Sequence, residues 1–205
     1  MVKLIGVTHG MSVDSIFGYY KKIDLYPSNG IKNYISRLPK KSRIGIEFFP
    51  ESELREIDYK MGKNNFSFNG DNYWTELIKI IKEYDHDIIY LENIDLWEGI
   101  INNLIKVHEE KNKEIFLEEN ESNIEYNKKL IEHNESLHKA RINYRKIFEM
   151  DRDNILKQNT LSKKLDLSIV GLWHANYWFH EKEDYFEEYH SDEPKMNGSN
   201  NFHMI

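Results

Sequence analysis

The sequence predicts an α/β fold with a mainly parallel central sheet flanked by helices, and three observations support this prediction. Four short apolar runs have the length and composition of buried strands: 3–7, 43–49, 87–92 and 166–170. Between the first three runs, apolar residues recur at helical spacing, as in repeated strand–helix–strand units. A chain of 205 residues with 40% hydrophobic residues is also long enough to bury one core of this kind.

Helix start and stop signals place the helices between these strands. We expect helices at 12–20 with Ser12 as N-cap, at 30–38 before Pro39, from the acidic start Pro50–Glu53 onward, at 74–84 and at 176–189. Each strand is therefore expected to end in a turn that leads into a helix.

The middle of the chain, 96–148, differs in character from the rest. It begins with Ile100, Ile101 and Leu104 at helical spacing and continues with a stretch dominated by Glu, Lys and Asn. We predict a long projecting helical hairpin here, inserted into a single α/β domain over 1–190. The hairpin is read mainly as a solvated pair of helices, and it offers a surface for homo-oligomer formation. Residues 191–205 are expected to form a flexible tail.

Composition excludes several classes of function. The net charge of −7 argues against a nucleic-acid partner or an anionic membrane. The absence of cysteine excludes disulfides, zinc–thiolate sites and thiol nucleophiles. No signal peptide is visible, and no apolar run approaches the roughly 18 residues of a membrane span. We therefore expect a soluble, cytoplasmic protein.

Two Gly-x-x-His motifs follow predicted strands, Gly6-Val7-Thr8-His9 and Gly171-Leu172-Trp173-His174. In parallel sheets, ligands bind outside the carboxyl ends of the strands. We expect the fold to bring His9 and His174 together at this edge. The alternative is two unrelated histidines, each satisfied by local hydrogen bonds.

Glu47 is the sharpest further candidate, because it interrupts an apolar strand and a buried unpaired charge is costly. It requires a metal, a donor or a cation, and its alternative reading is an ion pair with a structural arginine. Glu92 at the end of the third strand is read as a solvated acid. Arg152 lies at an apparent helix start between Asp151 and Asp153, and its alternative is simple pairing with those acids.

These residues support two hydrolytic chemistries. In the first, His9, Glu47 and His174 hold a divalent metal that acidifies water, and Arg152 binds the oxyanion. In the second, one histidine is the general base, Glu47 orients it, and Arg152 stabilises the transition state.

The two Gly-x-x-His motifs, with Glu47 and Arg152 between them, resemble in their order the TraB/GumN/Tiki group of the erythromycin-esterase/ChaN-like superfamily. The resemblance spans about residues 3–178. It implies an α/β fold and, by likeness to the Tiki members, peptide cleavage that depends on a divalent metal such as Mn, Co or Zn. It also implies His9, Glu47, Arg152 and His174 as the site residues.

Other branches of that superfamily leave the substrate open, because the esterase branch works without metal and the ChaN branch resembles haem binders. The function expected from the sequence is a hydrolase acting on an amide, peptide or ester bond of a small molecule or peptide. The alternative is a non-catalytic module that binds a haem-like ligand in the histidine pocket and a partner through the hairpin.

Overall fold

The computed structural model describes residues 2–8, 25–62, 72–118, 121–181, 186–194 and 200–204. The described strands form one sheet in the order β3-β2-β4-β1-β5-β6, and only the last pair, β5 with β6, is antiparallel. The strands are β1 (Val2–Val7), β2 (Arg43–Ile46), β3 (Asp87–Tyr90), β4 (Leu167–Gly171), β5 (Phe186–Pro194) and β6 (Asn200–Met204). The prediction of an α/β fold with a mainly parallel sheet is confirmed.

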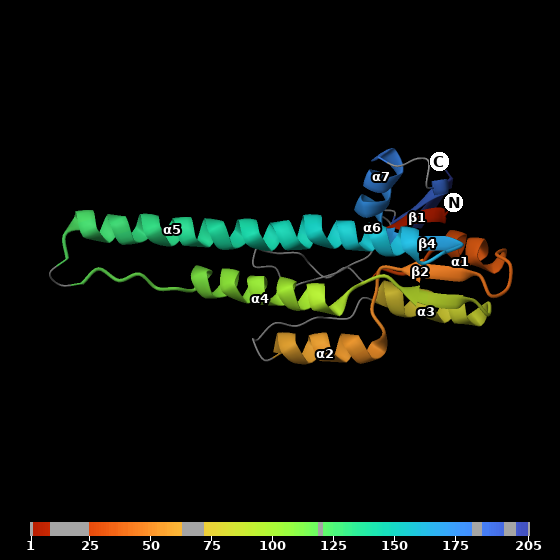
Figure 1. Ribbon diagram of the computed structural model, residues 1–205, viewed down its shortest axis with the longest axis horizontal. Coiled ribbons are helices and arrows are strands. Elements are labelled where there is room, and N and C mark those ends of the chain that lie inside the picture. The colour runs from red at the N-terminus through yellow and green to blue at the C-terminus, as the bar shows by residue number, and fades with distance from the viewer. Residues whose placement is uncertain are drawn as a thin grey trace.

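Helices follow the strands along the chain; α1, α3, α6 and α7 lie beside the strands, while α2, α4 and α5 extend to one side of the sheet (Figure 1). They are α1 (Asn29–Ser36), α2 (Glu51–Gly62), α3 (Asn72–Glu83), α4 (Ile94–Lys111), α5 (Asn123–Arg145), α6 (Arg152–Ser162) and α7 (Leu172–Glu181), with a π-helical segment η1 (Lys146–Asp151) joining α5 to α6. The helix predicted at 12–20 lies outside the described residues. The helix expected at 176–189 starts earlier and stops at Glu181.

Each face of the sheet has its own apolar core. On one face, Ile5, Ile44 and Ile169 from three strands pack with Ile31 and Trp74 from α1 and α3. The other face carries a second set, in which α6 and α7 cover the strands: Leu4, Leu156, Val170, Ala175 and Trp178. The alternation of side chains along a strand explains why both sets come from the same short apolar runs.

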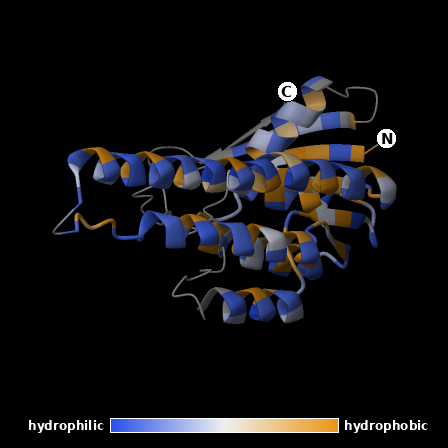
Figure 2. Ribbon diagram, turned by 60° about the vertical axis from the view of Figure 1, so that its left-hand side comes forward, coloured by the Kyte–Doolittle hydropathy of each residue, from blue (hydrophilic) through white to orange (hydrophobic). Residues whose placement is uncertain are grey.

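A third core lies beyond the carboxyl end of β2. Phe49, Ile57 and Trp97 pack there with Leu104 of α4 and Tyr144 of α5. This contact joins the inner parts of α4 and α5 to the rest of the molecule. In the stretch 109–135, by contrast, no described residue is buried. Figure 2 shows that hydrophilic residues predominate along α5, with separate hydrophobic residues between them. The projecting hairpin, with its part in oligomer formation, stays a prediction.

We expect residues 109–135 to be dispensable for folding. Joining residue 108 to 136 through a short Gly/Ser linker removes no residue that is buried as a whole among the described ones. One cooperative thermal transition is therefore expected, with a midpoint within about 4 °C of the full chain, since about 1 kcal/mol corresponds to a shift of that size. Leu104→Ala is the contrasting variant, and we expect it to cost about 2–5 kcal/mol because Leu104 is buried in the third core. Circular dichroism during heating measures the transition. Loss of cooperative unfolding in the shortened chain would contradict this expectation. Size-exclusion chromatography of the same protein tests the oligomer prediction.

Part of the segment expected to be a flexible tail, 191–205, belongs to the sheet, since β5 reaches Pro194 and β6 covers Asn200–Met204. Residues 195–199 and 205 lie outside the described residues. β5 pairs with β1 in parallel, with Val7 opposite Asp192. The Asp192 carboxylate is fully buried and accepts hydrogen bonds from the Tyr73 hydroxyl at 3.0 Å and the Ser28 amide at 3.3 Å. Burial raises the pKa of this carboxyl above its usual value, although these donors oppose the shift. The polar composition of β5 hid a strand in which Asp192 Oδ2 is bonded to Ser28, the N-cap of α1, and to Tyr73 of α3.

Within the described part of the chain, no helix combines the length and the apolarity needed to cross a membrane. A cytoplasmic location and the absence of a nucleic-acid partner stay predictions.

Candidate functional site

A cluster of buried ionisable side chains lies at the carboxyl ends of β2, β3 and β4. Glu47 follows β2 directly, Glu92 comes two residues after β3, and His174 lies in the first turn of α7 directly after β4. Arg152 and Asp153 reach the cluster from the first turn of α6. All five side chains are buried. The edge predicted from the sequence is therefore where Glu47, Arg152 and His174 meet, whereas His9 lies outside the described residues.

Arg152 is the centre of the cluster and is 4% exposed. Its Nη2 donates to both Glu47 and Glu92, and its Nε donates to Glu92 Oε1 at 2.9 Å. Its guanidinium carbon lies 5.5 Å from the Trp97 ring centroid and 5.4 Å from that of Phe148. Burial alone lowers the pKa of Arg152, but the charges of Glu92 and Glu47 outweigh it and raise the pKa above its usual value. The guanidinium is thus fixed and charged.

The two glutamates hold Arg152 and are themselves held by neutral donors. Glu47 accepts a second hydrogen bond from the Gly171 amide at 2.5 Å, and Glu92 accepts one from the Trp97 indole at 2.9 Å. The reading of Glu47 as a buried carboxylate that needs a partner therefore agrees with its surroundings. The reading of Glu92 as a solvated acid is wrong, because the chain after β3 turns inward and directs this side chain to Arg152.

His174 connects Arg152 to Asp153. Its Nδ1 lies 2.6 Å from Asp153 Oδ1, and its Nε2 lies 3.2 Å from Arg152 Nη1 and 3.6 Å from Glu47 Oε1. A carboxylate only accepts and a guanidinium only donates. These contacts therefore favour the tautomer with the proton on Nδ1 and the lone pair on Nε2. Asp153 also accepts from the Trp178 indole at 2.7 Å, which fixes its orientation.

Asp153 is the residue of this site that the sequence did not indicate, whereas Glu92 is expected at the end of the third strand but as a solvated acid. The sequence left open that Arg152 pairs with Asp151 or Asp153 at the surface. In the structure Arg152 bonds to Glu47 and Glu92. Asp153 bonds to His174. The segment η1 accounts for this arrangement. Its wider π-helical turns shift the phase of the helix, so that α5 packs on α4 while Arg152 and Asp153 both face the sheet. Such π-helical turns often occur at functional sites.

The glycine of the first Gly-x-x-His motif brings the second motif close to β1. A Cβ on Gly6 would lie 2.9 Å from Ala175 Cβ and 3.2 Å from Leu172 Cα, both on α7. Gly6 thus allows the helix that carries His174 to approach the strand that precedes His9. The two motifs are therefore linked by packing, a relation that their sequence spacing alone does not reveal.

We expect Gly6→Ala to displace α7 and to lower the free energy of unfolding by about 1–3 kcal/mol, the usual cost of overpacking. Gly99→Ala in α4 is the matched control, because a Cβ there meets nothing within 4 Å. We expect this control to be neutral or stabilising by about 0.4–1 kcal/mol. Urea denaturation of both variants measures the difference. Equal stability of the two variants would show that Gly6 does not set the approach of α7.

The donor set around Glu47 and His174 does not fit a metal among the described residues. No group of three His, Cys, Asp or Glu side chains in the described ranges is arranged to hold a metal ion. The described contacts of these two residues point instead to Arg152, since Glu47 and the Nε2 of His174 both face its guanidinium. His9, the third predicted ligand, lies outside these ranges, so the divalent metal site of His9, Glu47 and His174 stays a prediction.

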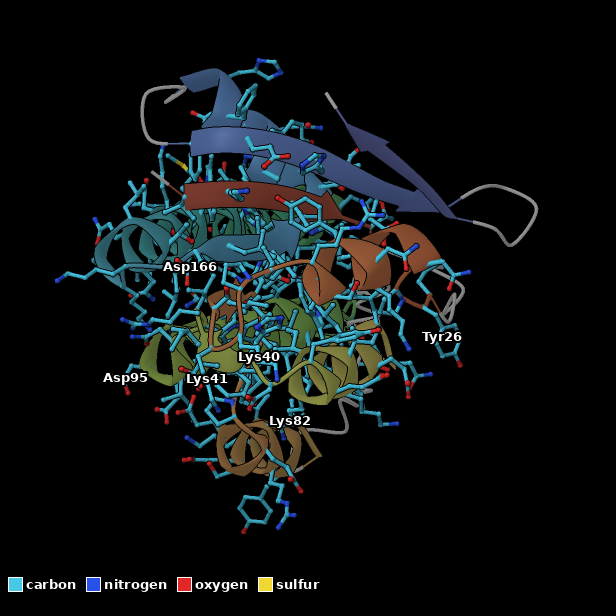
Figure 3. The ribbon with its side chains drawn as sticks, turned by 90° about the vertical axis from the view of Figure 1, so that its right-hand side faces the viewer. Tyr26, Lys40, Lys41, Lys82, Asp95 and Asp166 are labelled. Carbon is cyan, nitrogen blue, oxygen red and sulfur yellow. The ribbon has the colours of Figure 1, made fainter. Side chains whose placement is uncertain are left out.

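One surface cavity lies at the opposite, amino ends of β1 and β2. Its lining includes Lys3, Pro39, Lys40, Lys41 and Asp166, and Figure 3 labels three of these residues, Lys40, Lys41 and Asp166. Lys41 pairs with Asp85 at 2.7 Å and Lys3 with Glu188 at 3.2 Å. Because its ionisable groups are solvated and two of its lysines have acidic partners, this cavity lacks the buried chemistry of the cluster at the carboxyl ends.

No family model matches the sequence, and neither a curated protein nor a solved structure matches it. The resemblance to the TraB/GumN/Tiki group thus rests on the two Gly-x-x-His motifs, Glu47 and Arg152, and it stays a prediction.

Proposed function

We propose that the protein is a hydrolase that cleaves an ester or an amide bond in a small molecule or peptide. The observation that carries the proposal is the chain of contacts Asp153–His174–Arg152, with 2.6 Å between Asp153 Oδ1 and His174 Nδ1 and 3.2 Å between His174 Nε2 and Arg152 Nη1. It places an oriented base beside a fixed cation, two groups that can catalyse hydrolysis without a metal.

The proposed reaction starts at His174. The single lone pair of Nε2, which accepts from Arg152 Nη1, exchanges that hydrogen bond for one from water and takes a proton from the water. The oxygen of that water attacks the carbonyl carbon of the substrate. Asp153 holds the imidazole in the required tautomer and stabilises the imidazolium that forms. When the tetrahedral intermediate collapses, the leaving group departs with the proton from Nε2. The proton that His174 takes from water thus leaves with the alcohol or amine, and the reaction needs no further reactant.

Arg152 is proposed to stabilise the oxyanion. A guanidinium has five N–H donors, and the described hydrogen bonds of Arg152 use one on Nε, two on Nη2 and one on Nη1. The remaining donor lies on Nη1, the nitrogen that faces His174. The oxyanion and the attacking water would thus be held side by side. Glu47 and Glu92 serve as positioning residues, because they fix the plane of the guanidinium.

The experiment is a screen of the full chain against aliphatic and aromatic esters and short peptides, before and after treatment with a chelator. Turnover that resists chelation supports the metal-free reaction. Loss of turnover that Mn, Co or Zn restores would show that a metal joins this site and would replace the mechanism proposed for His174. Absence of turnover with a Soret band in the purified protein would favour the alternative of haem-like ligand binding.

A further inference from the structure

Two large aromatic side chains are exposed together on α7. Trp173 is 61% exposed and Tyr177 is 46% exposed. Their ring planes are nearly parallel, at 6°, with centroids 5.9 Å apart, as expected for residues one helical turn apart. The chain has four tryptophans, and the other three, Trp74, Trp97 and Trp178, are buried. Trp173 is thus the exception, and the apolar cores do not explain its position.

The aromatic pair lies directly beside the ionisable cluster. The Trp173 ring lies 5.2 Å from the His174 imidazole, edge to face at 79°. His174 points inward to Asp153 and Arg152, while Trp173 points outward from the same turn of α7. The exposed rings therefore lie on the outer side of the turn that carries His174, next to the proposed base.

A positive charge lies beside the pair. Lys157 of α6 places its Nζ 5.9 Å from the Tyr177 ring centroid. The surface therefore combines flat apolar rings with a cation at one edge. Aromatic rings prefer to stack on other rings in offset or edge-to-face geometry, and a cation nearby favours a ligand that carries a carboxylate.

We propose that Trp173 and Tyr177 bind the non-reacting part of the substrate, namely an aromatic ring in the acyl group, and that Lys157 favours a carboxylate on that ring. This inference rests on the proposed function and assigns it a substrate class, the esters or amides of aromatic acids. The three residues are specificity determinants and take no part in the chemical step.

The test compares ethyl phenylacetate with ethyl acetate, two substrates that share a leaving group, with acid release followed in a pH-stat. In Trp173→Ala and Tyr177→Ala, KM for ethyl phenylacetate is expected to rise roughly 3–10-fold, the factor that an aromatic pair contributes, while kcat is unchanged. KM for ethyl acetate is expected to stay the same. In Trp173→Phe, KM for ethyl phenylacetate is expected to stay close to the wild-type value, because an aromatic ring is kept. Lys157→Met is expected to raise KM only for the 4-carboxyphenylacetate ester.

The control variant is Tyr59→Ala. Tyr59 is 65% exposed on α2, which Figure 1 shows on the side of the molecule away from α7. This substitution removes an exposed aromatic ring without changing Trp173 or Tyr177. An equal change in KM for both esters in Trp173→Ala, or no change in either, would overturn the proposed ring subsite while the hydrolase proposal stands.

A binding measurement separates the two proposals. Isothermal titration of phenylacetate into the wild type and into Trp173→Ala needs no turnover. Binding that weakens 3–10-fold in the variant, in a protein that hydrolyses no ester or peptide, supports the ring subsite and contradicts the hydrolase. Binding that is absent in the wild type, or equal in both proteins, contradicts the ring subsite.

Discussion

Arg152→Met is expected to lower the free energy of unfolding by about 3–5 kcal/mol, because removing one partner of a buried ion pair leaves an uncompensated charge. The upper part of this range is expected, since two buried carboxylates, Glu47 and Glu92, share the same guanidinium. Methionine keeps much of the length of the side chain and its packing beside Trp97 and Phe148, so the effect reports on charge. Urea denaturation measures it.

The companion variants separate charge from shape. Arg152→Met combined with Glu47→Gln and Glu92→Gln removes the uncompensated charges and is expected to recover part of the lost stability. Arg145 is an exposed arginine seven residues earlier in the same helical run. Arg145→Met is expected to stay within about 0.5 kcal/mol of the wild type. If Arg152→Met were as stable as Arg145→Met, the buried network would carry no stability.

Arg152→Lys addresses the catalytic role. Lysine keeps the positive charge but not the planar fork of donors that faces Glu47, Glu92 and His174. We expect a folded protein whose turnover falls about 10²–10³-fold, the usual effect of losing a donor to an oxyanion. Unchanged turnover in this variant would assign Arg152 to the scaffold alone.

The strands and their common edge could be predicted because burial on both faces leaves a simple signal. The runs that became β1 to β4 are almost continuously apolar, as strands covered by helices on both sides must be. Within such a run, Glu47 is conspicuous, and its position after β2 placed it at the edge where ligands bind in parallel sheets. The contact of Glu47 with Arg152 and the Gly171 amide follows from this position.

Of the two partners from α6, Arg152 was predicted and Asp153 was not. The contacts of both could not be predicted, because the phase of a helix depends on turns that leave no sequence signal. The segment η1 decides that Arg152 and Asp153 both face inward, and nothing in its composition marks it as π-helical. Buried indole N–H groups indicate that carboxylate acceptors lie nearby. Trp97 and Trp178 each need an acceptor, and they find it in Glu92 and Asp153.

β5 escaped prediction for a different reason. Its buried residues include His190, Ser191 and Asp192, which break the apolar pattern of a strand. The free edge of β1 supplies backbone partners for this segment, and Tyr73 and Ser28 supply donors for Asp192. These compensations are tertiary contacts, so a local pattern cannot reveal them.

His174→Asn is expected to reduce turnover by about 10²–10⁴-fold, the contribution of a positioned general base, with little loss of stability. The asparagine amide can still donate to Asp153, so the buried carboxylate keeps a partner, but no group remains to take the proton. Asp153→Asn is expected to reduce turnover as well, because an amide can present a donor to Nδ1 and so favour the wrong tautomer. Its carbonyl can still accept from Trp178.

The matched control is His180→Asn, an exposed histidine on the same helix. It is expected to leave both turnover and stability unchanged. Steady-state kinetics on the best ester or peptide substrate, with urea denaturation of the same samples, gives both quantities. If His174→Asn and His180→Asn had equal turnover, the Asp153–His174–Arg152 network would be a structural feature and the proposed base would have to lie elsewhere. If Asp153→Asn alone kept full turnover, His174 would act without an orienting carboxylate.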